Sequence, residues 1–319
     1  MKLLSQKMGE IPLTDHPVPV FEKSIIPTST RYIGAGRDGD YMFQEIPFTG
    51  GFIRLTHLLE KSENKILIVE DKPVIIFQLG LQHSLTYRLD DLGVMLFHEW
   101  GYNFYYTLAL VKEIQFNKKD SYVVLELQVN FEYLSEIGFH HASVKHFLDR
   151  IQDGKPAKLA KVNQIASPAM MEKARVIFEG DLDQMNERAK ELVFLAIENQ
   201  FINPIKKAGK LTAVEIDKIY EVKDFLFSNL HTKFTSEEIA SQMKISTYQV
   251  KKGFREIYGI TAIELSNLER MYQADKLIAK DEKKIWEIAI LLGYKSESSF
   301  LRAYKKHYGE TPSNRQRKS

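Results

Sequence analysis

Residues 287–308 read EIAILLGYKSESSFLRAYKKHY, and residues 238–258 read EIASQMKISTYQVKKGFREIY. The two stretches follow one pattern, in which matching residues lie 49 positions apart before an internal turn and 50 apart after it. An internal duplication tolerates a one-residue slip best within a turn between matching helices. The repeat therefore decides the fold of the last hundred residues.

Each copy predicts a helix, a short turn and a second helix. Thr235 and Glu238 have the spacing of a capping box at the start of the first copy. Gly293 supplies the turn of the second copy, whereas Lys244 replaces this glycine in the first, where we expect a less regular turn. The candidate caps of the second helices are Ser246 or Thr247 in the first copy and Ser296 or Ser298 in the second.

The second helix of each copy has an apolar side and a largely basic side, which is the helix-turn-helix plan. A basic helix face is usually only solvated, but within this repeat it is placed to reach phosphates and base edges. Arg302 is the first choice for base readout, because arginine binds guanine bidentately. Glu297 could accept from a cytosine amino group or merely cap its helix. The candidate DNA-contacting residues are Tyr248, Gln249, Lys251, Lys252, Arg255, Glu297, Ser298, Ser299, Arg302, Lys305 and Lys306.

This region resembles the DNA-binding domain of the AraC/XylS class of bacterial transcription regulators. The resemblance rests on residues 287–300 and on Gly309-Glu310-Thr311-Pro312-Ser313 with Arg315, and it covers roughly residues 220–315. It implies two helix-turn-helix units joined by a long helix, here Ala262 to Ile278. Their recognition helices would enter successive major-groove segments roughly 34 Å apart.

A finer resemblance concerns residues 251–259, which read KKGFREIYG. This sequence is similar to the corresponding segment in the branch of the class typified by the ferric-siderophore-responsive regulator of pyochelin uptake. The resemblance implies a small-molecule effector, specifically a metal–siderophore complex, and RNA polymerase as a further partner. It implies no cofactor.

Composition and charge bound the remaining possibilities. The chain has 319 residues and no cysteine, which excludes disulfides and thiolate chemistry. Residues 221–319 carry 18 Lys and Arg against 13 Asp and Glu, whereas the rest is net acidic. A basic C-terminal third indicates a polyanionic partner for that third. We expect a cytoplasmic bacterial protein associated with the nucleoid, because no secretion signal or membrane-spanning run is seen.

The first part of the chain predicts a fold rich in short strands. The predicted strands are Phe52–Leu59, Lys65–Glu70, Val74–Leu81, Ser84–Leu89, Phe104–Val111 and Tyr122–Val129. Gly, Pro, Asn and Asp between them mark turns, as in a barrel or jelly-roll-like double sheet. The fold class is therefore α+β, with a β-rich sensing domain over residues 1–155.

A helical connector is predicted over residues 156–218, followed by an all-α DNA-binding domain over residues 219–319. The connector helix from Leu182 to Phe201 carries an apolar stripe that includes Met185, Leu192 and Ile197. Such a stripe packs against the same chain or forms a homodimer contact, and the pattern leaves both open.

Two motifs in the first domain favour ordinary structural roles. The glycines at positions 34, 36 and 39 match the dinucleotide fingerprint by spacing, but a strand rather than a helix follows them. His83, His98, His140 and His141 lack metal-ligand spacing, so we expect no metal site.

An aromatic cluster supplies the candidate ligand site. Trp100, Tyr102, Phe104 and Tyr106 could line a barrel mouth and hold a flat or metal-chelated ligand. Core packing is the competing interpretation for each of these rings.

These patterns favour a sequence-specific DNA-binding transcription regulator, not an enzyme, that acts as a ligand-responsive activator of iron or nutrient-uptake genes. Two alternatives remain open at this point. One is a barrel-domain enzyme with a DNA-binding tail, and the other is an architectural DNA-binding protein without a sensor.

Overall fold

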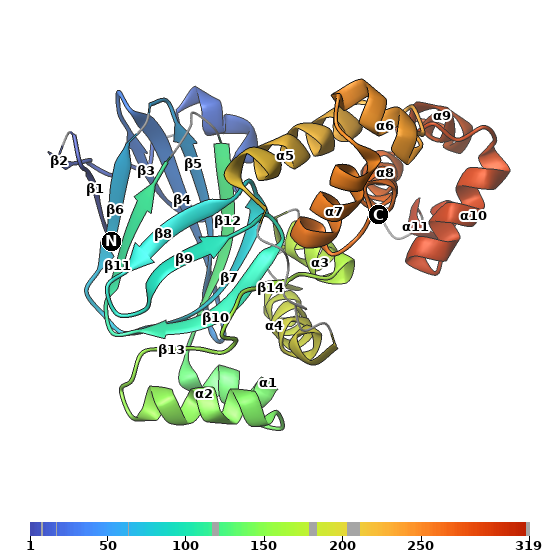
Figure 1. Ribbon diagram of the computed structural model, residues 1–319. Helices are drawn as coiled ribbons and strands as arrows, with labels where there is room; N and C mark the ends of the chain where they lie inside the picture. The colour runs from blue at the N-terminus through green and yellow to red at the C-terminus, as the bar shows by residue number, and fades with distance from the viewer. Residues whose placement is uncertain are drawn as a thin grey trace. The chain divides into compact units, whose positions relative to one another are not determined.

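The computed structural model describes residues 1–7, 9–16, 18–62, 64–116, 121–178, 184–202 and 211–316. The chain divides into two compact units, Met1–Lys206 and Lys207–Ser319. The first unit is rich in strands and the second is helical, which confirms the α+β class (Figure 1). Residues 156–202 belong with the strands, and one helix crosses residue 219, where the sequence placed a domain border.

Two antiparallel sheets form the first unit. The six-stranded sheet has the order β2 (Gly9–Glu10), β1 (Lys2–Ser5), β6 (Lys65–Glu70), β11 (Leu110–Gln115), β8 (Leu85–Leu89) and β9 (Gly93–Phe97). The other sheet has the order β13 (Ala157–Lys158), β10 (Gly101–Thr107), β7 (Val74–Gln82), β12 (Ser121–Val129), β5 (Gly51–Glu60), β4 (Gly39–Phe48) and β3 (Thr30–Ala35), and β14 (Gln164–Ile165) also pairs with β10.

The core of this unit lies between the two sheets. Phe43 and Leu58 of one sheet pack in the same cluster as Ile68 and Ile114 of the other. On β6 every second residue is buried, the alternation expected of a strand with one covered face. The predicted double sheet is therefore present, and the inward-facing side chains of both sheets fill the space between them.

One predicted strand is wrong. Phe104–Val111 is not continuous, because β10 ends at Thr107 and β11 begins at Leu110 in the other sheet. The Asp91 carboxylate accepts from the Thr107 hydroxyl at 2.8 Å and from the Leu108 N–H at 2.9 Å, which turns the chain. Periodicity could not show this crossing, because the residues on both sides of it are apolar.

The glycine-rich segment 34–39 connects β3 and β4, which pair antiparallel. It is a hairpin turn, as the sequence indicated, and no helix follows it.

The helices of the first unit are α1 (Phe131–Gly138), α2 (Ala142–Gln152), α3 (Pro168–Phe178) and α4 (Met185–Ile202), with a 3-10 helix at Pro19–Ser24. The apolar stripe of α4 is buried within this unit, with Leu192 and Val193 fully covered. The Tyr102 hydroxyl of β10 donates to the Ala196 carbonyl at 2.9 Å. The stripe therefore packs on the larger sheet and α3, and it is not free to form a dimer contact.

The second unit contains α5 (Ala213–Ser228), α6 (Ser236–Met243), α7 (Thr247–Tyr258), α8 (Ala262–Ala279), α9 (Ile285–Leu291), α10 (Glu297–Tyr308) and α11 (Pro312–Gln316). The long helix α8 contacts α7 of the first repeat and α9 of the second, and it also contacts the flanking helices α5 and α11. It thus holds the two repeats together, as the resemblance implied.

Candidate nucleic-acid interface

The first repeat, α6 and α7, begins each helix with a capping box. The Thr235 hydroxyl accepts from the Glu238 N–H at 3.2 Å, and Glu238 accepts from the Thr235 N–H at 2.7 Å. Ser246 caps α7 in the same reciprocal way with Gln249. These bonds satisfy backbone donors that a helix leaves unpaired at its start.

The turn of this repeat places Lys244 in the left-handed conformation, with φ 52° and ψ 46°. Gly293, the matching residue of the second repeat, has φ +74°. The two turns therefore share a conformation that glycine adopts freely and a residue with a Cβ adopts at a cost. The expected irregularity of the first turn is not seen.

The second repeat, α9 and α10, rests on a cluster of aromatic side chains. Phe300 and Tyr304 are fully buried, and their ring centroids lie 5.9 Å apart. The Tyr304 hydroxyl donates to Asp275 of α8 at 2.6 Å, and Arg315 of α11 donates to the same carboxylate at 2.9 Å. These bonds and the buried rings fix the inner side of α10 and turn its other side outward.

The predicted outer faces of α7 and α10 are exposed. Tyr248 and Lys251 on α7, and Arg302, Lys305 and Lys306 on α10, have exposed side chains. None of the four cations among them forms an ion pair with any residue in the described parts of the chain. They are free to neutralise phosphates or to donate to base edges.

Three of the predicted residues already have bonding partners in the domain. The Gln249 side chain and Ser299 take part in the caps of α7 and α10. Arg255 donates to the Gly259 carbonyl at 3.2 Å and lies 3.8 Å from Glu264. These three residues are therefore weaker candidates for contact with DNA than Lys251 or Arg302.

Glu297 does not provide the cap that the sequence left open for it. Ser296 caps α10 by accepting from the Ser299 N–H at 3.2 Å. Glu297 and Ser298 are exposed in the first turn, beside the cap. A carboxylate at this position is favourably placed with respect to the helix dipole.

A groove runs between α5 and the first turns of α7. Its empty volume is about 350 Å³, and Ile219, Ile245, Tyr248 and Lys252 are among its lining residues. Beside it α5 and α7 approach each other closely, since a Cβ on Gly253 would lie 2.3 Å from Ile219 Cγ1. Three of the predicted DNA-contacting residues, Tyr248, Gln249 and Lys252, thus line this groove.

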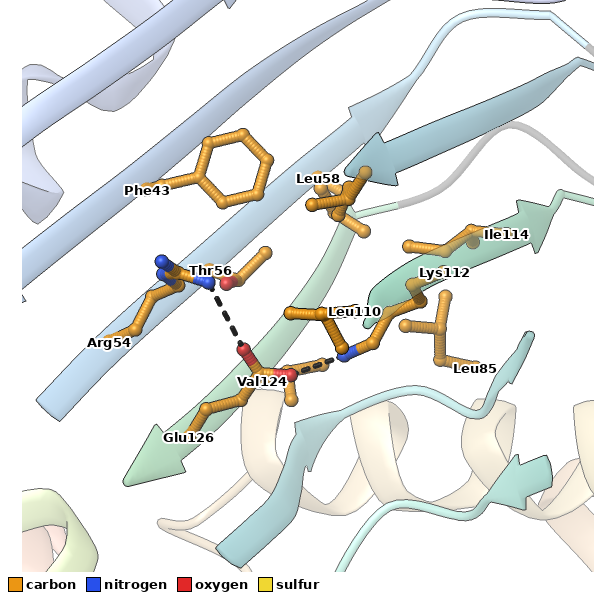
Figure 2. Close-up of a pocket in the computed structure, with 11 residues that line it drawn as sticks. Phe43, Arg54, Thr56, Leu58, Leu85, Leu110, Lys112, Ile114, Val124 and Glu126 are labelled. Carbon is orange, nitrogen blue, oxygen red and sulfur yellow. Dashed lines mark hydrogen bonds and ion pairs between the residues drawn. The ribbon is translucent and has the colours of Figure 1, made fainter. Parts of the chain in front are cut away.

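A second feature, in the first unit, was not predicted from the sequence. Figure 2 shows Arg54 of β5, Lys112 of β11 and Glu126 of β12 facing one another inside the double sheet. Glu126 pairs with Lys112 and lies 3.9 Å from the Arg54 guanidinium. All three are at most 4% exposed. The signal was present in part, since Lys112 alternates with the buried Leu110 and Ile114 on β11, and Glu126 follows the buried Tyr122 and Val124 on the same face of β12.

These charges belong to a larger buried network. Glu45 and Glu70 also bind Arg54, and together with Glu126 they hold its pKa above the usual value although burial opposes this. The Gln78 amide oxygen accepts from Lys112 at 3.1 Å and from two buried tyrosine hydroxyls. A buried charge must be paired in this way, because leaving it alone in a protein interior costs several kcal/mol or more.

The charges border a cavity between the sheets with an empty volume of about 320 Å³. Only a small part of that volume is wide enough for a water molecule. Its other walls are apolar and include Phe43, Leu85 and Val124. The open space is about that of one water molecule, so a larger molecule could enter only if the sheets separated.

The four aromatic residues predicted as a ligand site lie elsewhere. Tyr102, Phe104 and Tyr106 alternate with Tyr105, and Tyr105 is the ring of β10 that faces the interior between the sheets. Tyr102 instead bonds to α4, and Trp100 lies in the turn before β10 with φ 65°. None of the four lines the cavity, because helices cover the other face of the strand. Their alternation could not reveal that both faces are buried.

The histidines form no cluster. His98 bonds to the Ser84 hydroxyl at 2.9 Å, and His141 lies 2.8 Å from Glu198. Within the described parts of the chain, no three histidine or carboxylate side chains are grouped as metal ligands. No helix in those parts is both long and apolar enough to cross a bilayer.

Comparison with known proteins places the second unit in a class. Residues 239–318 match the model of a family described as a helix-turn-helix domain. The C-terminal unit carries a helix-turn-helix domain of the AraC/XylS class. The first unit lies outside this match, so the family model does not describe it.

Two curated relatives resemble part of the chain. The chain is 35% identical over 124 residues to the HTH-type transcriptional activator FapR of Escherichia coli, covering 38% of this chain and 46% of that protein. It is 31% identical over 91 residues to the bifunctional transcriptional activator/DNA repair enzyme AdaA of Bacillus subtilis, covering 28% of this chain and 43% of that protein. The matches thus span less than half the length of either relative.

Some of the solved structures that match cover about a third of the chain. A DNA-binding transcriptional dual regulator from Escherichia coli K-12 is 29% identical, with a TM-score of 0.30, covering 32% of this chain and 90% of that one.

Proposed function

We propose that the protein is a sequence-specific transcription regulator that binds double-stranded DNA through α7 and α10. The observation that carries this proposal is the duplicated domain, with exposed cations on the second helix of both repeats and α8 between the repeats. Arg302, Lys305 and Lys306 would contact the second half-site, and Tyr248, Lys251 and Lys252 the first.

The test is selection of bound sequences from a random duplex pool with the full chain. We expect enrichment of one site with two half-motifs whose centres lie about one helical turn apart. Binding should weaken steeply with salt, because phosphate contacts release counterions. Failure to enrich any sequence would overturn the proposal and return attention to the enzyme alternative.

We further propose that the first unit senses a small effector and that the interior cavity, more than the four aromatic residues, receives it. Arg54, Lys112 and Glu126 supply the polar groups, and the surrounding aliphatic side chains supply the apolar surface. Because the cavity is narrow, binding would push the sheets apart and disturb the paired charges. This step would couple the ligand to the rest of the unit.

The effector class that we propose first is an iron–siderophore complex, and its support is the resemblance of residues 251–259. The proposed output is activation of uptake genes through contact with RNA polymerase, in the bacterial cytoplasm at the nucleoid. Calorimetric titration of the full chain with ferric siderophores, beside the Lys112→Met variant, tests the site. Equal binding by both proteins would exclude the cavity.

A homodimer is a separate proposal. The buried stripe of α4 cannot form it, but Phe194 on the same helix is 48% exposed and offers another contact. Light scattering of the full chain and of Phe194→Ser would test this surface. A monomer at working concentration would overturn it.

A further inference from the structure

The loop between α5 and α6 is bonded to the helix that joins the two repeats. Arg270 of α8 is 2% exposed, and its Nε donates to the Leu230 carbonyl at 2.9 Å. Its Nη2 donates to the Thr232 carbonyl at 2.6 Å, and its Nη1 to Asn267 at 3.0 Å. A guanidinium presents its donors in a rigid planar fork, so these bonds hold the loop in one position.

The same loop touches the turn of the second repeat. A Cβ on Gly293 would lie 2.4 Å from the His231 carbonyl oxygen, so the two backbones are in close contact. Lys233 Nζ lies 3.6 Å from the centroid of the Tyr294 ring, a cation–π contact. Tyr294 in turn packs edge-on against Phe300 of α10, with centroids 5.4 Å apart. The loop thus reaches the residues that orient α10.

The loop also belongs to the first repeat. It ends at Thr235, which caps α6, and Phe234 packs on Phe225 of α5 with ring centroids 5.0 Å apart. The two repeats are therefore connected twice, once along α8 and once across residues 230–233. A single helical connection would let the two repeats rotate relative to each other about the ends of α8. A second connection restricts this rotation.

We propose that residues 230–233, held by Arg270, act as a strap that fixes α10 relative to α7 and so sets the half-site spacing that the domain accepts. Arg270 is then a positioning residue: it contacts no DNA but decides how strictly the two recognition helices are spaced. This inference rests on the proposed function, since spacing has meaning only if both helices bind one duplex.

The experiment measures binding of the full chain to the selected duplex and to duplexes whose spacer is one, two or three base pairs longer or shorter. We expect the wild-type affinity to fall roughly tenfold or more when the spacer changes by two base pairs, the scale of a misplaced base contact. Arg270→Met should reduce this fall to about threefold or less while keeping the preference for each half-motif.

Lys276→Met is the matched control. It removes a positive charge from an exposed position of the same helix, six residues after Arg270, where Lys276 lies 4.7 Å from the Tyr272 ring centroid. It should keep the wild-type spacing preference. If Arg270→Met weakens binding to every spacer equally, Arg270 contributes only to stability and the strap is excluded. A wild-type chain that enriches no sequence would instead overturn the proposed function.

A second pair of variants tests the strap from the other side and does not depend on Arg270. Gly293→Ala directs a Cβ into the His231 carbonyl, whereas Gly309→Ala meets a similar backbone, φ +76°, with nothing within 4 Å. Gly293→Ala should shift the preferred spacing or flatten the preference, and Gly309→Ala should leave it unchanged. Identical spacing profiles for the two alanine variants would exclude the strap.

Discussion

The two repeats of the C-terminal unit have one architecture but depend on different interactions. Reciprocal capping boxes begin both helices of the first repeat. In the second repeat Lys284 precedes α9, so only Glu287 accepts there, from the Lys284 N–H at 2.7 Å. In the second repeat the Asp275 carboxylate of α8 also binds the inner side of α10 and Arg315 of α11. Both copies bury aromatic rings and cap their second helices, and they differ in the cap of the first helix and in these Asp275 bonds.

Their turns show the same contrast. Lys244 adopts the left-handed conformation although it carries a Cβ, which costs free energy that a glycine at this position would not. Gly293 meets the His231 carbonyl so closely that a Cβ has no room. Matching positions of a duplicated sequence can therefore share a conformation with different residues, and at Gly293 the His231 carbonyl additionally excludes a Cβ.

The largest expected effect comes from truncating the central ring of each repeat. Phe254→Ala and Phe300→Ala should each destabilise the unit by about 3–5 kcal/mol, because both rings are fully buried. Hydrogen exchange followed peptide by peptide would report the loss. If the repeats depend on different contacts, Phe300→Ala should expose the α10 amides more than those of α6. Equal exposure in both variants would show that the repeats unfold as one.

The next largest effects on the free energy of unfolding are expected from Gly309→Ala and Gly293→Ala. Gly309→Ala should cost about 1–2 kcal/mol, the price of a Cβ in the left-handed region. Gly293→Ala should cost more, because the Cβ also meets the His231 carbonyl oxygen. Urea unfolding of the full chain measures both. Equal urea midpoints for the two variants would mean that the loop carrying His231 moves aside at little energetic cost. The close contact at Gly293 would then contribute little to stability.

For DNA binding, the comparison is between Arg302, which forms no ion pair within the described residues, and Arg255, which already has bonding partners in the domain. Arg302→Ala should weaken binding to the selected duplex by about 1–3 kcal/mol and relax the preference at one base position. Arg255→Ala should cost less, since Arg255 already binds Gly259 and Glu264. Fluorescence anisotropy at fixed salt gives both values. The assignment of Arg302 fails if its substitution leaves the affinity for every sequence unchanged.

The smallest effects come from exchanging local features between the repeats. Thr235→Ala should cost about 1 kcal/mol as a lost cap, and Lys284→Thr should gain several tenths to about 1 kcal/mol by creating one. Lys244→Gly should be neutral or stabilising by about 1 kcal/mol, since relief of the left-handed strain opposes the entropy of glycine. Hydrogen-exchange rates of the α6 and α9 amides would detect these changes. Slower exchange in α6 after Thr235→Ala, or faster exchange in α9 after Lys284→Thr, would contradict the proposed role of the caps.

Much of the second unit follows from local sequence. The capping box at Thr235, the cap at Ser246 and the burial of Phe254 depend on residues three or four positions apart, which a helix brings together without help from the rest of the chain. The outward direction of Lys251 and Arg302 follows from the same period. The predicted basic face is confirmed as exposed for this reason.

The bonding partners of the arginine side chains could not be predicted in the same way. Arg255 turns to the C-terminal end of its own helix, and Arg270 binds a loop 38 to 40 positions earlier. In the first unit the crossing at Leu108 and the burial of both faces of β10 depend on which strands and helices become neighbours. Local patterning does not contain that information.

The sequence by itself therefore determined the duplicated helices, their caps, the exposed basic faces and the presence of a β-rich first unit. The tertiary structure decided where charged and aromatic side chains meet: Arg54 with Glu126 inside the double sheet, Tyr102 beneath α4, and Arg270 against the loop before α6. The physical reason is range. Helix periodicity and capping act within one or two turns, whereas a buried charge or a close backbone contact finds its partner only after distant segments have packed.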